Sequence, residues 1–135
     1  MKRHPGFPAL VLLVTVLAWP PSVCAGPQDA AVEHFEKKIR PLLLGRCQKC
    51  HGTQEAKGGL RLDSGDALRR GGGSGKVVIE GKPDESLLIQ AVRYAGEVHM
   101  PPDGRLSTQQ VSDLTAWIKA GAVWPGSAFR WPRPS

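Results

Sequence analysis

Two cysteines and a histidine are the side chains of this sequence whose types and spacing could do chemistry. They occur in the string CQKCH at 47–51, and a second short string, HMPP, follows at 99–102. CxxCH is the attachment signature of c-type haem. On a helical turn, residues three apart share one face, so Cys47 and Cys50 could bond to the two vinyl groups of a porphyrin while His51 ligates the iron. The string therefore predicts one covalently bound haem c.

Three other chemistries use cysteine pairs of this kind. A structural zinc needs four ligands, and the chain offers Cys47, Cys50, His51 and His99 without a second pair at the usual spacing. A thioredoxin-like redox pair needs a βαβ context, which the hydrophobic periodicity does not supply. A plain disulfide would close a loop too short to restrain much chain entropy, and it would leave His51 unexplained. The specificity of the motif favours haem c over these alternatives.

A haem iron bound by His51 needs a second axial ligand, and Met100 is the candidate. It is the only methionine besides Met1. A core methionine usually lies on the apolar face of a helix. Met100 instead precedes two prolines, which are expected to hold its loop extended.

Two histidines compete with Met100 for the iron. His34 is expected among solvated positions of the first helix. His99 is adjacent to Met100, so its side chain should point to the opposite side of an extended loop. Because cytochromes c commonly bind their iron through one His and one Met, we predict Met100 as the distal ligand and keep His99 as its competitor.

Residues 1–25 have the features of an export signal. A basic start is followed by the apolar run 7–19, by two prolines, and by small residues at the recognition positions of a cleavage site. The run is shorter than the roughly 20 apolar residues of a membrane-spanning helix. We therefore expect cleavage before Gly26, a periplasmic or secreted bacterial protein, and no membrane span afterwards. A lipid anchor on Cys24 is a second interpretation, disfavoured because residues 21–23 suit such a site poorly.

The positive charge of the chain is concentrated around the CxxCH string. The formal net charge is +6, and residues 37–61 hold seven basic side chains and one acidic side chain. Charge runs are usually solvated faces, but this one could also steer an acidic redox partner protein to the site. Nucleic acid is not expected, since no basic run is interleaved with stacking aromatic residues.

The hydrophobic pattern predicts helices and almost no strand. Residues 29–44 form an amphipathic helix, bent or restarted at Pro41, and a second helical turn after Gly45 carries CQKCH. Residues 52–76 hold half of the glycines and predict a long flexible loop with one turn of helix.

The second half of the chain is expected to form two more helices. Residues 82–94 predict a helix of about three turns that ends near Gly96. A final helix begins at the capping-box pattern of Ser107 and Gln110 and stops at Gly121. The fold class predicted is all-α.

Several strings together resemble one family, the planctomycete-type cytochrome c domain. They are FEKKIRPLL, CQKCH, KGGLRLDS, GGGSG, KPDESLLIQAVRY, HMPPDGRLS and AWIKAGAVWP, and the resemblance covers about residues 33–125. It implies a small all-α fold of three to five helices around one covalently bound haem. It also implies that Cys47 and Cys50 bind the haem and that Met100 is the distal ligand opposite His51.

This resemblance leads to an expected arrangement. Residues 1–25 are the signal, 26–125 the cytochrome c domain, and 126–135 a Pro/aromatic tail without assignment. The first and last helices should cross near Phe35 and Trp117, and Trp124 should either cap one edge of the haem or anchor the tail. The expected apolar lining is Leu42, Leu43, Leu60, Leu62, Leu87, Leu88, Leu106 and Ile118.

The expected function is single-electron transfer by an exported mono-haem cytochrome. Two protein ligands would leave no substrate position on the iron, and no nucleophile and base pair stands out, so catalysis is not predicted. The alternative is an N-terminal haem module, electron-transferring or sensory, of a larger exported enzyme, here free-standing or truncated. Family members commonly form the first part of longer exported proteins.

Overall fold

The computed structural model describes residues 1–2, 18–20 and 26–126, so most of the predicted signal and of the tail lies outside the described residues.

The first helix is long and contains one irregular turn. The helix consists of α1 (Pro27–His34), a π-helical turn η1 (Phe35–Ile39) and α2 (Arg40–Arg46). In the π turn the Arg40 amide donates to the Phe35 carbonyl, and Pro41, which has no amide hydrogen, follows at once. The predicted irregularity at this proline is therefore confirmed.

The end of this helix corrects one boundary. Gly45 lies inside α2, and the helix ends at Arg46, with Cys47 as its C-terminal cap, rather than at the glycine. Residues 47–50 then form a separate turn. The CxxCH string thus continues directly from the first helix, with no linker between them.

The glycine-rich segment has little regular structure, as expected. It contains a 3₁₀ turn η2 (Lys57–Gly59) and one short helix α3 (Gly65–Arg70). The Ser64 hydroxyl accepts a hydrogen bond from the Ala67 amide at 3.2 Å and caps the start of α3.

The helix predicted for residues 82–94 is interrupted, which corrects the prediction. A 3₁₀ turn η3 (Pro83–Glu85) is separated from α4 (Leu87–Arg93) by the extended residue Ser86. The Ser86 hydroxyl accepts from the Ile79 amide at 2.9 Å and donates to the Lys82 carbonyl at 2.9 Å. These bonds stabilise the extended conformation of Ser86 between η3 and α4. α4 then ends at Arg93, with Tyr94 as its C-terminal cap, before the predicted stop at Gly96.

The last helix, α5 (Thr108–Lys119), confirms its predicted boundaries. The Ser107 hydroxyl accepts from the Gln110 amide, and the Gln110 side chain accepts from the Ser107 amide, which forms a capping box. Gly121 follows the helix with φ of +102°, a left-handed conformation that favours glycine.

The first and last helices pack against each other through aromatic side chains. The ring centroid of Phe35 lies 6.0 Å from that of Trp117 and 4.8 Å from that of Trp124. Phe35 and Trp117 are buried. The predicted contact of these helices is therefore confirmed, and Trp124 belongs to it.

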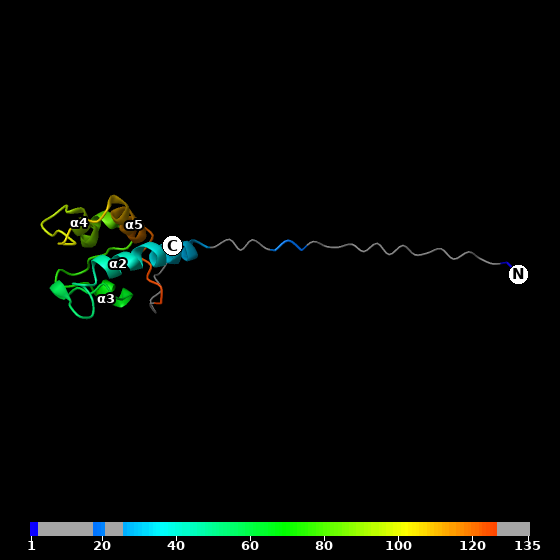
Figure 1. The fold of residues 1–135 in the computed structure, drawn as a ribbon, viewed down its shortest axis with the longest axis horizontal. Helices are drawn as coiled ribbons and strands as arrows, with labels where there is room; N and C mark the ends of the chain where they lie inside the picture. Colours follow the sequence, from blue (N-terminus) through cyan, green and yellow to red (C-terminus); the bar gives the residue numbers. More distant parts are fainter. Residues whose placement is uncertain (3–17, 21–25, 127–135) are drawn as a thin grey trace.

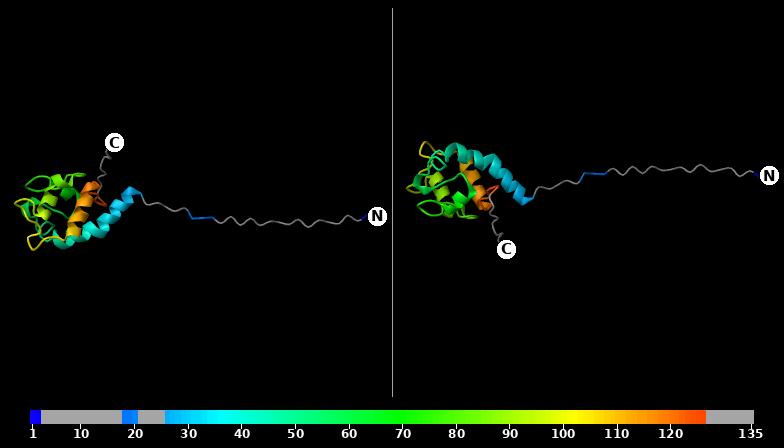
Figure 2. Two further views of the ribbon diagram at one scale, coloured as in Figure 1. Left: turned by 90° about the horizontal axis from the view of Figure 1, so that it is seen from above. Right: turned by 90° about the horizontal axis from the view of Figure 1, so that it is seen from below.

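The other elements lie on two sides of this helix pair. In Figure 1, α2 runs through the middle, α4 and α5 lie on one side, and α3 lies on the other. Figure 2 shows α5 alongside the first helix. Residues 26–126 contain no β-strand, and only two isolated bridges occur there. The all-α class is thus observed in the described residues, none of whose helices has the length and apolarity needed to span a lipid bilayer.

The buried serine that breaks the fourth helix allows a first test. Ser86→Ala removes the acceptor of the Ile79 amide at a fully buried position, where water cannot replace it. We expect the free energy of unfolding to fall by about 1–3 kcal/mol in urea denaturation. Ser112→Ala, at an exposed position of α5, is the control and should change it by less than about 0.5 kcal/mol. Equal stabilities of the two variants would contradict the assigned role of Ser86.

Candidate functional site

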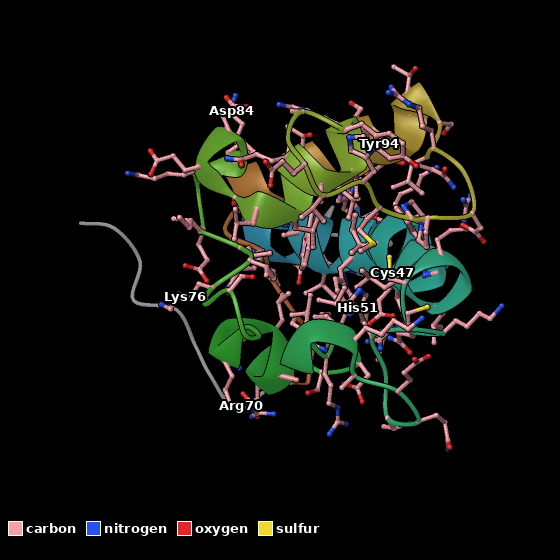
Figure 3. The ribbon with its side chains drawn as sticks, turned by 90° about the vertical axis from the view of Figure 1, so that its left-hand side faces the viewer. Cys47, His51, Arg70, Lys76, Asp84 and Tyr94 are labelled. Atoms are coloured by element: carbon pink, nitrogen blue, oxygen red, sulfur yellow. The ribbon has the colours of Figure 1, made fainter. Side chains whose placement is uncertain are left out.

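A single cavity brings together the side chains that the sequence singled out. Its volume is about 500 Å³, and its wall includes Cys47, Cys50, His51 and Met100. The two strings, far apart in the sequence, therefore meet at one site. In Figure 3, Cys47 and His51 lie near the centre of the molecule, between the α3 side and the α4 side.

The wall of this cavity is mostly apolar. Five of the predicted leucines contribute to it, namely Leu43, Leu60, Leu62, Leu87 and Leu88. Leu42, Leu106 and Ile118 do not, because they are buried in the helix packing instead. Sequence analysis missed Val77, Val92 and Leu114. Val92 stands four residues after Leu88 on α4, a spacing that could have revealed it.

The CxxCH turn has the geometry of one helical turn. The amides of Cys50 and His51 both donate to the Cys47 carbonyl, at 3.2 and 2.9 Å. Both cysteines are free thiols in this structure, so the predicted alternative of a disulfide is not formed here. Burial raises the pKa of the Cys47 thiol to about 11, with a smaller opposing effect of Arg46. Cys47 therefore stays protonated at neutral pH.

The imidazole of His51 is oriented by a backbone carbonyl. Its Nδ1 lies 3.3 Å from the Leu60 oxygen, and a hydrogen bond to a carbonyl requires the proton on Nδ1. Nε2 then carries the lone pair that can bind a metal. The Leu60 carbonyl, nine residues away, is therefore the group that orients the His51 ring.

The glycine-rich segment forms part of the cavity wall rather than a flexible coil. The Gly73 amide donates to the Gly58 carbonyl at 2.7 Å. A Cβ on Gly72 would lie 2.8 Å from the Gly58 oxygen and 3.0 Å from the Leu60 Cβ. The segment thus packs directly against the stretch whose carbonyl holds His51. Only a residue without a side chain allows this approach.

Met100 lines the cavity, whereas its competitors do not. The Met100 amide donates to the Ala91 carbonyl at 3.1 Å, and the residue is half-buried. The exposed His99 stacks on Tyr94 instead. The expectation that His34 is solvated is wrong, because it is half-buried and its Nε2 lies 3.0 Å from the Asp113 carbonyl of α5.

The donor set fits a haem better than a bare metal ion. Two thiols, an imidazole and a thioether surround an apolar space, which matches covalent attachment of a porphyrin and two axial bonds to its iron. Within residues 1–2, 18–20 and 26–126, no three His, Cys, Asp or Glu side chains come together as a metal-binding group.

Ion pairs compensate much of the basic charge near the site. Five of the seven basic side chains of residues 37–61 contact carboxylates. The pairs are Lys37–Glu33, Arg40–Glu36, Arg46–Asp103, Lys57–Glu55 and Arg61–Asp63. Four of the five carboxylates lie outside residues 37–61, so a count along the segment overstates the local charge.

Helices around an apolar cavity with a CxxCH turn in its wall define the class of the c-type cytochromes. Residues 47–104 match the model of the family described as Planctomycete cytochrome C. This match supports a planctomycete-type cytochrome c domain in this part of the chain. The match runs from Cys47 to Gly104 and thus includes both strings that line the cavity. No curated protein and no solved structure gave a significant match.

The glycine contact beside His51 allows a second test. In Gly72→Ala the new methyl group must displace the Gly58 carbonyl or the Leu60 backbone. We expect thermal or urea unfolding to show a loss of about 1–3 kcal/mol. Gly96→Ala, on the same cavity wall but with nothing within 4 Å of the new Cβ, should be neutral or slightly stabilising. A Gly72→Ala protein as stable as Gly96→Ala would exclude the close approach.

Proposed function

We propose that this chain is an exported mono-haem cytochrome c that transfers single electrons. The observation that carries the proposal is the gathering of Cys47, Cys50, His51 and Met100 on one apolar cavity. The family match supports haem-based electron transfer in general. CxxCH occurs once in the chain, which supports a single haem.

Each of these side chains has a distinct role in this proposal. Cys47 and Cys50 form the two thioether links, and their common turn holds both sulfurs on one face. His51 and Met100 would ligate the iron. When bound, the haem supplies an iron that alternates between the ferrous and ferric states.

The surroundings of the ligands suit electron transfer rather than catalysis. His51 and Met100 would together hold the iron in both oxidation states, which would leave no need for a ligand from a substrate. A soft thioether favours the ferrous state and raises the potential. The Leu60 carbonyl keeps the His51 ring in one orientation, and the apolar wall limits access of water.

The choice of axial ligand can be tested by two neighbouring substitutions. Met100→Ala should abolish the thioether-to-iron absorption band of the ferric protein and lower the midpoint potential by on the order of 0.1 V. His99→Ala should keep the band and shift the potential far less, because His99 does not line the cavity. Visible spectra and redox titration of protein matured with a c-haem assembly system provide the measurements.

Two results would contradict this function. If His99→Ala rather than Met100→Ala removes the band, the ligand assignment is wrong. If the denatured protein loses its haem, or its mass is that of the bare polypeptide, there is no covalent haem c.

We further propose that the redox partner is a protein with an acidic docking surface. Lys49 lies between the two cysteines, is exposed, and makes no ion pair within the described part of the chain. Lys38 is the other basic residue of 37–61 without such a pair. A cation beside the CxxCH turn would attract an anionic partner to the site.

Small inorganic oxidants test this charge without knowledge of the partner. Lys49→Glu should slow oxidation of the ferrous protein by the ferricyanide anion several-fold at low salt, and the effect should fade as the Debye length shrinks. A cationic cobalt complex should show the reverse trend. Lys119→Glu, at the end of α5, is the control of equal net charge. Equal rates for the two variants would place the docking surface elsewhere.

A further inference from the structure

We propose that Tyr94 is a positioning residue for Met100. It holds the Met100 loop, defined as residues 95–105, against α4 and so keeps the thioether in the cavity. This inference rests on the proposed function, in which Met100 binds the iron. Three features support it: the backbone of Tyr94, the contacts of its side chain, and the few other ties of the loop.

The backbone of Tyr94 has a costly conformation. Tyr94 caps the C-terminus of α4 with φ of 60° and ψ of 36°, in the left-handed region. Glycine is the usual residue at such a helix end, because a Cβ is sterically unfavourable there. A tyrosine persists in this conformation only where the surrounding structure holds it there. Strain of this kind is an observed feature from which a functional role can be inferred.

The side chain of Tyr94 contacts the Met100 loop at three places. The phenol donates a hydrogen bond of 2.7 Å to the Pro101 carbonyl, immediately after Met100. The ring is stacked on His99, immediately before Met100, with centroids 4.5 Å apart and planes at 3°. The Arg105 guanidinium lies 4.3 Å from the ring centroid, within cation–π range. One aromatic residue thus contacts the loop on both sides of Met100.

The backbone of Met100 is held from the same helix. Its amide donates to the Ala91 carbonyl near the end of α4. Two hydrogen bonds therefore hold the chain at Met100. One joins the Met100 amide to α4, and the other joins the Pro101 carbonyl to the hydroxyl of Tyr94, the cap of α4. The first bond involves backbone only. The second depends on the hydroxyl of Tyr94 and can be removed by mutation.

The rest of the loop has few other ties. Pro101 is its one buried residue, the Ala95 amide donates to the Gln90 carbonyl, and Asp103 forms an ion pair with Arg46. Glu97 and Val98 are exposed. At its far end, Arg46 of α2 donates to the Gly104 carbonyl at 2.9 Å. Segments with few buried contacts open at low free-energy cost, so a lost tie shifts their population measurably. Figure 3 shows Tyr94 on the α4 side of the site, above Cys47 and His51 in that view.

The test measures how readily an added base replaces Met100 on the iron of the haem-loaded protein. Tyr94→Phe removes the hydroxyl and keeps the ring. We expect the apparent affinity of the ferric protein for imidazole to rise roughly two- to tenfold, as expected for loss of one hydrogen bond. Tyr94→Gly should raise it further, although it relieves the backbone, because the ring contacts are lost as well.

Two controls separate positioning from general stability. Ser64→Ala removes the side-chain hydrogen bond that caps α3, away from the loop, and should leave the imidazole affinity unchanged. In a Met100→Ala background, Tyr94→Phe should also have no effect, because no thioether remains to be positioned. Equal increases in the presence and absence of Met100 would overturn the proposal.

The outcomes distinguish this inference from the proposed function. If the wild-type protein lacks the thioether-to-iron band, both fail. If the wild-type protein has the band and Met100→Ala loses it, but Tyr94→Phe leaves imidazole affinity and potential unchanged, only the role of Tyr94 is wrong.

Discussion

The packing of Phe35 against both Trp117 and Trp124 joins the two ends of the described fold. This contact sets the first helix against the last, and both walls of the cavity depend on it. The CxxCH turn continues from the first helix without a linker, so the position of α2 determines where Cys47 and His51 lie. Because α4 packs against α5, the Met100 loop that follows α4 faces the same cavity.

The two proposed iron ligands are supported in different ways. His51 is on a turn that continues a helix, and its ring is oriented by the Leu60 carbonyl of a segment packed against glycines. Met100 is on a loop in which only Pro101 is buried and whose side-chain hydrogen bonds to the rest of the fold come from Tyr94 and Arg46. A rigid imidazole and a more easily displaced thioether would let the protein tune its potential through the Met100 loop, without disturbing covalent attachment.

The apolar cavity also bears on stability. A chain of this size can bury only a small core, and a cavity of about 500 Å³ is a large part of it. Leu60, Leu87 and Val98 are incompletely buried around the site. An apolar ring seated there would remove part of this surface from water, so the proposed cofactor would act as a component of the core as well as the redox centre.

The sequence by itself determined the features that depend on neighbours a few residues apart. Hydrogen bonds between residues at most about five positions apart form the CxxCH turn and the capping box of Ser107. The irregular turn before Pro41 reflects a hydrogen bond that proline cannot donate. The sequence signals for all three features are therefore local. The cofactor class and the expected cavity residues at 47–51 and 100 follow from such short strings. Only the tertiary structure decided which distant groups complete them. The Leu60 carbonyl at His51, Asp113 at His34 and Asp103 at Arg46 are 9, 79 and 57 residues away from their partners. Contacts of that kind arise from the packing of whole elements, and no local pattern of residue types encodes them.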